Sequence, residues 1–207
     1  KKLEEYNAKR QQAELRIFNE ANEKYSGVDE IRHAPVGVVW GEGWENGVVG
    51  IVAAKLVEKY GKPFLVFGIK DGVATGSGRS VEGFSIYDAV NSCKQLFIKY
   101  GGHAQAVGLT ISAEKLPEFS KAINEYTEPL GQIPPNSFKI DGYLRPQQLV
   151  MDVFSQIDEL EPFGRENPVP IFCLSGVTIK NIRGMRSGNH CMIEIEKDGA
   201  AVMLLLF

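Results

Sequence analysis

The sequence predicts an α/β (α+β) fold with a mixed sheet, preceded by a connecting helix and followed by a mainly β domain. Three observations indicate this. Apolar residues recur at helical spacing before residue 26, short apolar runs alternate with helical segments between residues 34 and 128, and strands separated by turns fill the last part of the chain. With 207 residues, 43 % of them hydrophobic, the chain can bury a substantial core.

The first element is a helix over residues 1–25 with apolar side chains along one narrow face. These side chains are Leu3, Tyr6, Ala13, Ile17 and Ala21. No capping residue or turn precedes the helix, and Ser26-Gly27 ends it. We therefore expect residues 1–32 to form a connecting helix that continues from an upstream segment. The alternative is an arbitrary chain boundary.

From residue 34 the pattern changes to alternating strands and helices. We expect strands over 34–40, 63–69, 72–80 and 106–112, with a hairpin turn at Asp71-Gly72. We expect helices over 48–61, 86–100 and 114–128. The segment Gly101-Gly102-His103 is expected to be a turn. We assign residues 33–130 to this mixed-sheet domain.

Residues 131–137 interrupt the pattern with two consecutive prolines and are expected to be a linker. Beyond the linker we expect a strand over 138–144 and a helix over 146–160 with proline in its first turn. Strands over 172–185, 191–197 and 200–207, joined by the turns RSGNH and DG, predict a small antiparallel barrel or sandwich. We assign residues 136–207 to this second domain.

Several function classes find no support in the sequence. No apolar run approaches the length of a membrane-spanning helix and the first residues are charged, so we expect a cytoplasmic protein without a membrane partner. The three cysteines form no C-x-x-C pair. Phosphate-loop, nucleophile-elbow and H-E-x-x-H motifs are absent, and no Asp, Glu and His cluster at metal-ligand spacing. We therefore do not expect a self-contained hydrolase or metalloenzyme.

Charge is unevenly distributed along the chain. The net charge is −3, which argues against a general nucleic-acid coat. However, residues 89–113 and 167–193 contain no Asp or Glu while holding several Lys, Arg and His residues. These two windows are where an anion could bind, and chance gaps between acidic residues are the alternative.

Two short motifs have the chemistry of phosphate binding. In Gly101-Gly102-His103, the glycines let a ligand approach the backbone closely and the imidazole can donate to a phosphate oxygen. An ordinary helix cap followed by a polar loop residue is the alternative. In the run from Ser77 to Ser80, Arg79 can make a forked pair of hydrogen bonds to phosphate beside two serine hydroxyls. A solvated arginine in a loop is the alternative there.

A third motif, GEGWENGVVG, places Trp44 before a helix N-terminus. The indole could stack on a nucleic-acid base, or it could be a buried plug.

Together these motifs resemble a known family. In order they read WENGVVGIVAAKLVEKYGKP, GSGRS, GGHAQAVGLT, DGYL and LEPFGRENPVPIF. This succession resembles the C-terminal half of the bacterial single-strand-specific DNA exonucleases of the DHH phosphoesterase family, over nearly the whole chain. Two departures are Glu45, where many relatives carry histidine, and FGRENP in place of Phe-Gly-x-Gly-Asn-Pro. They put in doubt any role for the Trp44 loop.

The resemblance implies roles for named residues. The domain at 33–130 would be the DHH-associated domain, which holds substrate phosphates. Its implied contacts are Ser77, Arg79, Ser80, Gly101, Gly102 and His103. The domain at 136–207 would be an OB-like, nucleic-acid-binding fold that is incomplete at Phe207. Its candidate DNA contacts are Lys180, Arg183 and Arg186.

The implied function is the substrate-holding part of a single-stranded-DNA-specific 5′→3′ exonuclease that acts in DNA repair and recombination. The family's Asp-His-His metal site does not occur in this sequence. We therefore expect a chain that binds but does not cut, with no catalytic or metal-binding residue of its own. A divalent metal, Mn or Mg, is expected in the missing N-terminal DHH catalytic domain. Expected partners are single-stranded DNA, that catalytic domain and a single-strand-binding protein.

Two other functions are alternatives. One is a non-catalytic module that binds nucleic acid or protein. The other is a DHH-family phosphodiesterase acting on short oligonucleotides or cyclic dinucleotides. The β-rich tail argues against the second, because those smaller enzymes resemble this chain only to about Glu128.

Overall fold

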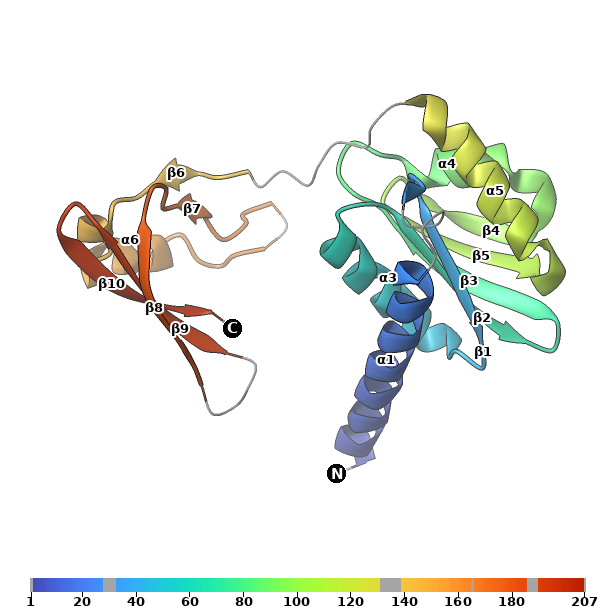
Figure 1. The fold of residues 1–207 in the computed structure, drawn as a ribbon, viewed down its shortest axis with the longest axis horizontal. Helices are drawn as coiled ribbons and strands as arrows, with labels where there is room; N and C mark the ends of the chain where they lie inside the picture. The colour runs from blue at the N-terminus through green and yellow to red at the C-terminus, as the bar shows by residue number, and fades with distance from the viewer. Residues whose placement is uncertain (1, 28–32, 131–138, 165, 186–189, 207) are drawn as a thin grey trace. The chain divides into compact units, whose positions relative to one another are not determined.

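The computed structural model describes residues 2–27, 33–130, 139–164, 166–185 and 190–206 (Figure 1). The predicted linker at 131–137 lies outside the described residues. The chain separates into two compact units, Lys1–Ser137 and Phe138–Phe207. Each unit is described by itself.

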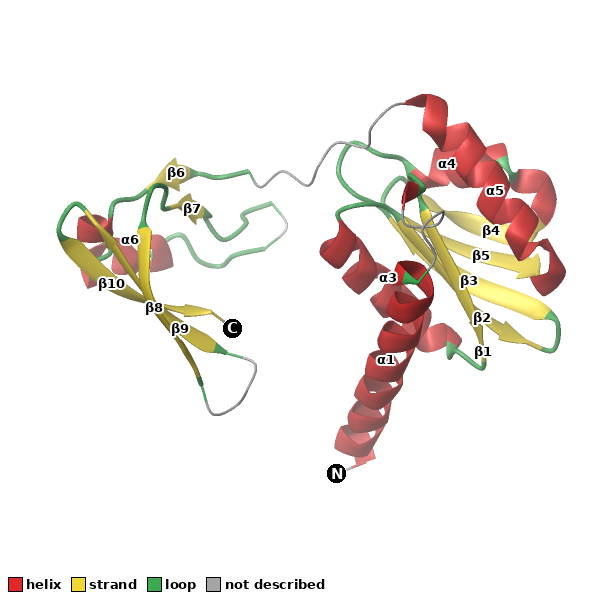
Figure 2. Ribbon diagram, in the orientation of Figure 1, coloured by secondary structure: helices red, strands yellow, loops and turns green. Residues whose placement is uncertain are grey.

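The first unit is built on a mixed five-stranded sheet (Figure 2). Its strands are β1 (Gly37–Glu42), β2 (Phe64–Lys70), β3 (Val73–Arg79), β4 (Phe97–His103) and β5 (Ala106–Ser112). The order across the sheet is β1-β2-β3-β5-β4, with β1 parallel to β2 and every other pair antiparallel. The predicted mixed α/β fold is therefore confirmed.

Helices cover the two faces of this sheet unequally. Helices α1 (Lys2–Ser26) and α3 (Asn46–Tyr60) pack on one face, over β1, β2 and β3. Helices α4 (Ile86–Ser92) and α5 (Leu116–Thr127) pack on the opposite face. Three short 3-10 turns, Lys94–Leu96, Ala113–Lys115 and Glu128–Leu130, flank these helices. On the face of α1 and α3, strands β5 and β4 remain exposed.

Successive side chains along each strand point to opposite faces of the sheet, so that an apolar core forms on each face. Leu65, Phe67 and Leu109 belong to the core under α4 and α5. Phe64 and Val66 belong to the core under α1 and α3. Helix α3 ends as predicted at Gly61, whose φ of +66° lets the backbone N–H bond to the Val57 carbonyl.

Two linked predictions in this unit are wrong. Residues 86–100 do not form a single helix, because α4 ends at Ser92 and β4 begins at Phe97. The Ser92 hydroxyl donates to the Ala89 carbonyl, and β4 then pairs with β5 along its length. Gly101-Gly102-His103 is consequently the end of a strand, and the turn that follows is at residues 104–105. Pairing with β5 prevailed over the local helical pattern.

The second unit is mainly β, as predicted. Strands β8 (Thr178–Gly184), β9 (Cys191–Lys197) and β10 (Ala200–Leu206) form an antiparallel sheet. Strands β6 (Gly142–Tyr143) and β7 (Phe172–Cys173) form a short parallel pair.

Three elements of this unit are shorter than predicted. The strand at 138–144 reduces to β6. The helix expected over 146–160 is a 3-10 turn at Pro146–Gln148 followed by α6 (Met151–Asp158). The strand expected over 172–185 is interrupted between β7 and β8, where Gly176 has a φ of +64°. Within the described residues, no helix is both long enough and apolar enough to cross a membrane.

Candidate functional site

The register of the sheet brings the two predicted phosphate motifs together. On β5, Gly108 pairs with Ser77 on one side and with Gly101 on the other. Likewise Ala106 pairs with both Arg79 and His103. Because paired residues share a face of the sheet, both motifs point to the same side. Segments more than twenty residues apart in sequence thus form one continuous surface.

This surface is the face that α1 and α3 leave open beyond β3. The alternate glycine on β3, Gly78, faces the other side, where a Cβ would lie 2.7 Å from Leu65 Cδ2 and from Val107 Cγ2. By contrast, a Cβ on Gly101 or Gly108 would meet no atom within 4 Å. Between Ser77 and Arg79 on one side and His103 on the other, the floor is therefore nearly bare backbone. We call this surface the open trough, formed by residues 75–79, 106–110 and 99–103.

Arg79 is held in place by one end of its guanidinium. Its Nη1 donates to Ser77 Oγ and to the Gly78 carbonyl, both at 2.8 Å. Ser77 Oγ in turn donates to the Val107 carbonyl at 3.3 Å. A guanidinium carries five N–H donors, so Nε and Nη2 keep theirs for a ligand. Among the described residues no carboxylate forms an ion pair with Arg79. Such an arrangement suits a phosphate, which accepts two parallel hydrogen bonds.

Helix α3 passes over this arginine at Gly50. A Cβ on Gly50 would lie 3.2 Å from both Arg79 Nη2 and Ser77 Oγ. The absence of a side chain at this point leaves room for the guanidinium beneath the helix.

His103 and Gly102 complete the opposite side of the trough. The exposed His103 ring accepts a hydrogen bond at Nδ1 from the Gln105 N–H, at 3.3 Å, which leaves Nε2 able to donate. Gly102 has a φ of +149°, and a Cβ there would lie only 2.2 Å from the Ala106 carbonyl oxygen. Gly102 is therefore required by the backbone, whereas Gly101 faces the open trough.

Ser80 is placed differently from its neighbours. Its hydroxyl donates to the Phe84 carbonyl at 2.7 Å, and its N–H donates to the Gln105 carbonyl at 3.0 Å. A serine hydroxyl has one proton, so in this geometry none is left for a phosphate. Ser80 links the end of β3 to the β4–β5 turn, a positioning role that the motif alone did not indicate.

The trough continues past the predicted residues. Thr110 on β5 pairs with Thr75 on β3 and with Lys99 on β4. These three side chains line a hollow of about 370 Å³ together with Gly101 and Gly108. No Asp or Glu occurs in the three strand segments of the open trough. Lys99 falls in the acid-free window 89–113, but the sequence did not single it out, because its strand had been assigned to a helix.

The Trp44 side chain is buried and is therefore not available to stack on a nucleic-acid base. Its indole is 3 % exposed, and Nε1 donates to Glu20 Oε2 at 2.6 Å. This hydrogen bond holds the pKa of the Glu20 carboxyl below its ordinary value. Glu45, which departs from the family pattern, forms an ion pair with Arg16 at 2.9 Å. The Trp44 loop thus fastens α1 to the sheet domain.

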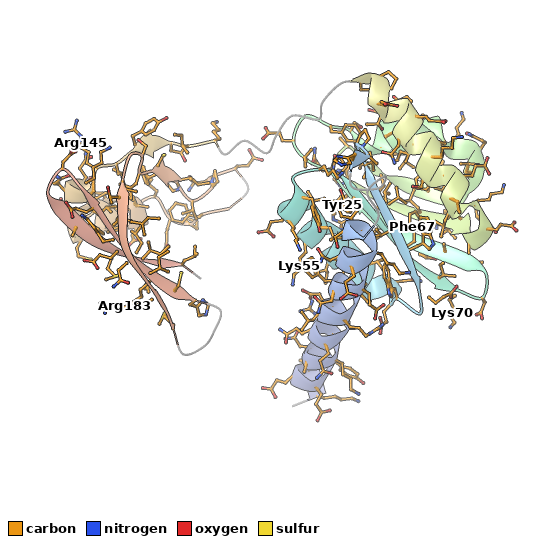
Figure 3. All side chains as sticks on the ribbon, viewed as in Figure 1. Tyr25, Lys55, Phe67, Lys70, Arg145 and Arg183 are labelled. Carbon is orange, nitrogen blue, oxygen red and sulfur yellow. The ribbon has the colours of Figure 1, made fainter. Side chains whose placement is uncertain are left out.

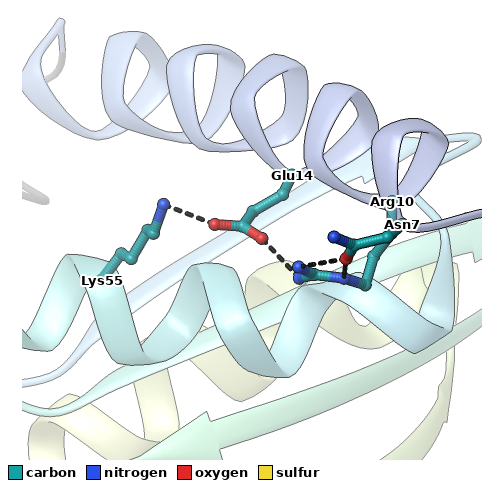
Figure 4. A network of polar contacts seen from close by, with 4 residues as sticks. All are labelled: Asn7, Arg10, Glu14 and Lys55. Carbon is teal, nitrogen blue, oxygen red and sulfur yellow. Dashed lines mark hydrogen bonds and ion pairs between the residues drawn. The ribbon is translucent and has the colours of Figure 1, made fainter. Parts of the chain in front are cut away.

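A second polar network fastens α1 to α3 (Figure 4). The Glu14 carboxylate, only 8 % exposed, contacts Lys55 of α3 and accepts from Arg10 Nη1 at 2.7 Å. The hydrogen bond from Lys55 is the main reason that the pKa of Glu14 lies below its ordinary value.

In the second unit, two of the three candidate DNA contacts can be placed. Arg183 is exposed on β8 (Figure 3). Lys180, on the same strand, forms an ion pair with Glu196 at 2.9 Å, and this partner raises the pKa of the lysine. Arg186 lies outside the described residues.

The same unit contains a hollow that sequence reasoning missed. It measures about 780 Å³, and its lining includes Tyr143, Arg145, Gln148 and Lys197. The Tyr143 side chain is 70 % exposed.

No metal centre is found among the residues that the structure describes. Within those ranges no three His, Cys, Asp or Glu side chains gather as metal ligands would. The described residues therefore do not form a site for a divalent metal, and no chemical step is assigned to one in them.

Comparison with known proteins identifies two domains in this chain. Residues 33–128 match the DHHA1 domain, and residues 140–207 match the RecJ OB domain. The chain is 30 % identical over 189 residues to the single-stranded-DNA-specific exonuclease RecJ of Bacillus subtilis strain 168, covering 87 % of this chain and 23 % of that protein.

Two crystal structures of RecJ from Thermus thermophilus share the fold. The complex with Mn²⁺ has a TM-score of 0.79 at 26 % identity and covers 98 % of this chain and 29 % of that one. The complex with Mg²⁺ has a TM-score of 0.77 at 25 % identity and covers 98 % of this chain and 31 % of that one. The chain thus spans less than a third of the length of these relatives.

A mixed-sheet DHHA1 domain followed by an OB domain defines the class of this chain as a two-domain portion of a DHHA1-containing protein. The chain belongs to the RecJ family of single-stranded-DNA-specific exonucleases and contains the DHHA1 and OB parts. The predicted resemblance is confirmed. The match of the second unit to the RecJ OB domain also disfavours a small phosphodiesterase that would lack this unit.

Proposed function

We propose that this chain is the substrate-holding part of a single-stranded-DNA-specific exonuclease that acts 5′→3′ in DNA repair and recombination. One observation carries the proposal. Ser77 and Arg79 on β3 lie in register with Gly101 and His103 on β4, on the open face of the sheet. Membership of the RecJ family supports the choice of single-stranded DNA as the ligand.

In this proposal the residues divide the work of holding a phosphate. Arg79 supplies the charge and a forked pair of donors from Nε and Nη2. Ser77 fixes the orientation of the guanidinium, and His103 donates from the other side through Nε2. Gly101 keeps the floor open, while Gly102 and Ser80 shape the backbone around it.

The OB unit would provide a second contact with the strand. Our candidates remain Lys180, Arg183 and Arg186, because single-stranded DNA is bound by basic surfaces together with stacking. We keep residues 1–32, 33–130 and 136–207 as the proposed connecting helix, DHH-associated domain and OB-like domain.

Cleavage is proposed to depend on the remainder of a RecJ-type enzyme. The crystal structures of the relatives contain Mn²⁺ or Mg²⁺. We assign the divalent metal to an N-terminal DHH catalytic domain, and we predict no metal-dependent nuclease activity for these 207 residues. A single-strand-binding protein as partner and a cytoplasmic location stay as predictions.

The test is a binding titration of the 207-residue chain with a 5′-phosphorylated single-stranded oligonucleotide. We expect Arg79→Ala to weaken binding by about 1.5 to 3 kcal/mol, as is usual for hydrogen bonds to a charged group. Lys121→Ala, on α5 at the opposite face of the sheet, is the control and should bind as the unmodified chain does. Equal affinities for Arg79→Ala and the unmodified chain would show that the trough does not hold the strand.

A further inference from the structure

The open trough holds a second polar row beside the row of the proposed phosphate contacts. Ser77, Gly108 and Gly101 form one row across the three strands, and Thr75, Thr110 and Lys99 form the next. Arg79, Ala106 and His103 form the row on the other side of the first, and the Arg79 guanidinium reaches the first row through its hydrogen bond to Ser77 Oγ. Rows that are two residues apart along a strand are separated by ~6.7 Å. An extended single strand passes from one phosphate to the next over a comparable length.

The second row is a hollow rather than a flat surface. Thr75, Lys99 and Thr110 line a space of about 370 Å³ whose floor includes Gly108 and Gly101. The two glycines belong to the first row as well. A ligand can therefore pass from one row to the next without crossing a side chain.

Lys99 brings an uncompensated charge to this hollow. Its side chain is exposed, and among the described residues no carboxylate forms an ion pair with it. The two threonine hydroxyls add short donors beside the ammonium group. One cation and two hydroxyls above a floor of glycines match the charge and the acceptors of a phosphodiester, and they include no acid that would pair with a cationic ligand.

From this geometry we infer that Thr75, Thr110 and Lys99 form a subsite for the phosphodiester next to the phosphate held by Arg79. The inference rests on the proposed function, because it extends the same bound strand along the trough. Lys99 is a phosphate-positioning residue in this scheme and contributes no base specificity. The subsite is filled only when the ligand has a second phosphate.

The experiment compares two ligands of different length on the 207-residue chain. The probes are thymidine 5′-monophosphate and a 5′-phosphorylated thymidine trinucleotide. Lys99→Ala should weaken trinucleotide binding roughly fivefold and flatten its dependence on salt, lowering the slope of log K against log salt by about 0.7. Binding of the mononucleotide should change less than about twofold, since it occupies only the Arg79 subsite.

Control variants separate this inference from the proposal beneath it. Lys121→Ala, on α5 at the opposite face, should alter neither ligand, and Thr110→Val should weaken only the trinucleotide. If Arg79→Ala weakens both ligands while Lys99→Ala weakens neither or both equally, the second subsite is wrong and the phosphate site stands. If Arg79→Ala affects neither ligand, the proposed function is wrong and the subsite with it.

Discussion

At the scale of single residues, the two adjacent glycines of the trough have opposite functions. Gly102 has a φ of +149°, and a Cβ there would approach the Ala106 carbonyl oxygen to 2.2 Å. Gly101 has open space where its side chain would be. One glycine therefore maintains the fold, and the other keeps the proposed ligand surface clear.

This difference predicts unequal stabilities for two alanine variants. We expect Gly102→Ala to destabilise the first unit by about 1 to 3 kcal/mol, because it combines backbone strain with a clash. Gly101→Ala should change the stability by less than about 0.5 kcal/mol, as surface substitutions usually do. Urea unfolding of both variants is the measurement, and equal losses of stability would contradict this account of the two glycines.

The sequence alone indicated Arg79, Ser77 and His103 as candidates, because arginine, hydroxyl and glycine-rich segments have recognisable phosphate chemistry, and the register places the three on one face. It was not sufficient to find Lys99. Residues 86–100 have helical spacing, and only the pairing of β4 with β5 shows which residues share a face with Arg79. The orientation of the Ser80 hydroxyl likewise depends on a loop contact that no local motif specifies.

At the scale of secondary-structure elements, the crossing of α3 over β3 controls the space around the arginine. A Cβ on Gly50 would lie 3.2 Å from Arg79 Nη2. The substitution Gly50→Ala should therefore displace the guanidinium by a few tenths of an ångström. The same change favours the helix by up to about 1 kcal/mol, because alanine has the higher helix propensity.

The prediction for Gly50→Ala is a loss of affinity without a loss of stability. We expect binding of a 5′-phosphorylated oligonucleotide to weaken about threefold or more, since a charge-assisted hydrogen bond to phosphate depends on geometry. Thermal unfolding should be unchanged or shifted upwards. Gly47→Ala on the same helix, where a Cβ meets nothing within 4 Å, is the matched control. Unchanged affinity in Gly50→Ala would mean that Arg79 Nη2 does not bind the phosphate.

The docking of α1 is predicted to depend on pH through Glu14. Lys55 and Arg10 hold the folded-state pKa of Glu14 below the ordinary value of 4.5. A lowered carboxyl pKa stabilises the fold above the unfolded pKa, and this contribution is lost as the pH falls through the folded-state value. Acidification below about pH 4.5 should therefore loosen α1.

The predicted role of the Glu14 charge is checked by comparing the unfolding free energy of Glu14→Gln with that of the unmodified chain. At pH 7 the variant should be less stable by about 1 kcal/mol, a modest value because both cationic partners are partly exposed. The difference should shrink as the pH approaches 3. The exposed Glu5→Gln, also on α1, is the control. A stability difference that stays constant between pH 7 and pH 3 would show that the charge of Glu14 does not matter.

Elements differ in how well they could be predicted. The helix of α3 and its end at Gly61 follow from local periodicity and a C-terminal glycine, and both are confirmed. The interruption between β7 and β8 at Gly176 and the split of the helix after Pro146–Gln148 could not be predicted. These breaks depend on how a small β unit closes on itself, which apolar runs alone do not specify.

At the scale of the whole molecule, an acidic chain is proposed to hold an anionic strand. The net charge of −3 opposes binding, so affinity must come from the local arrangement of cations on an acid-free surface. The open trough is such a surface, since Arg79, Lys99 and His103 lie along it without a neighbouring carboxylate in the strand segments.

The most direct test of this central claim is to map a 5′-phosphorylated trinucleotide on the chain by amide chemical-shift changes in NMR spectra. The account predicts the largest changes within the first unit at Ser77, Gly101 and Gly108, and their loss in the variant Arg79→Ala. Changes that spare these three amides while appearing elsewhere in the first unit would contradict it, because the strand would then lie on another surface.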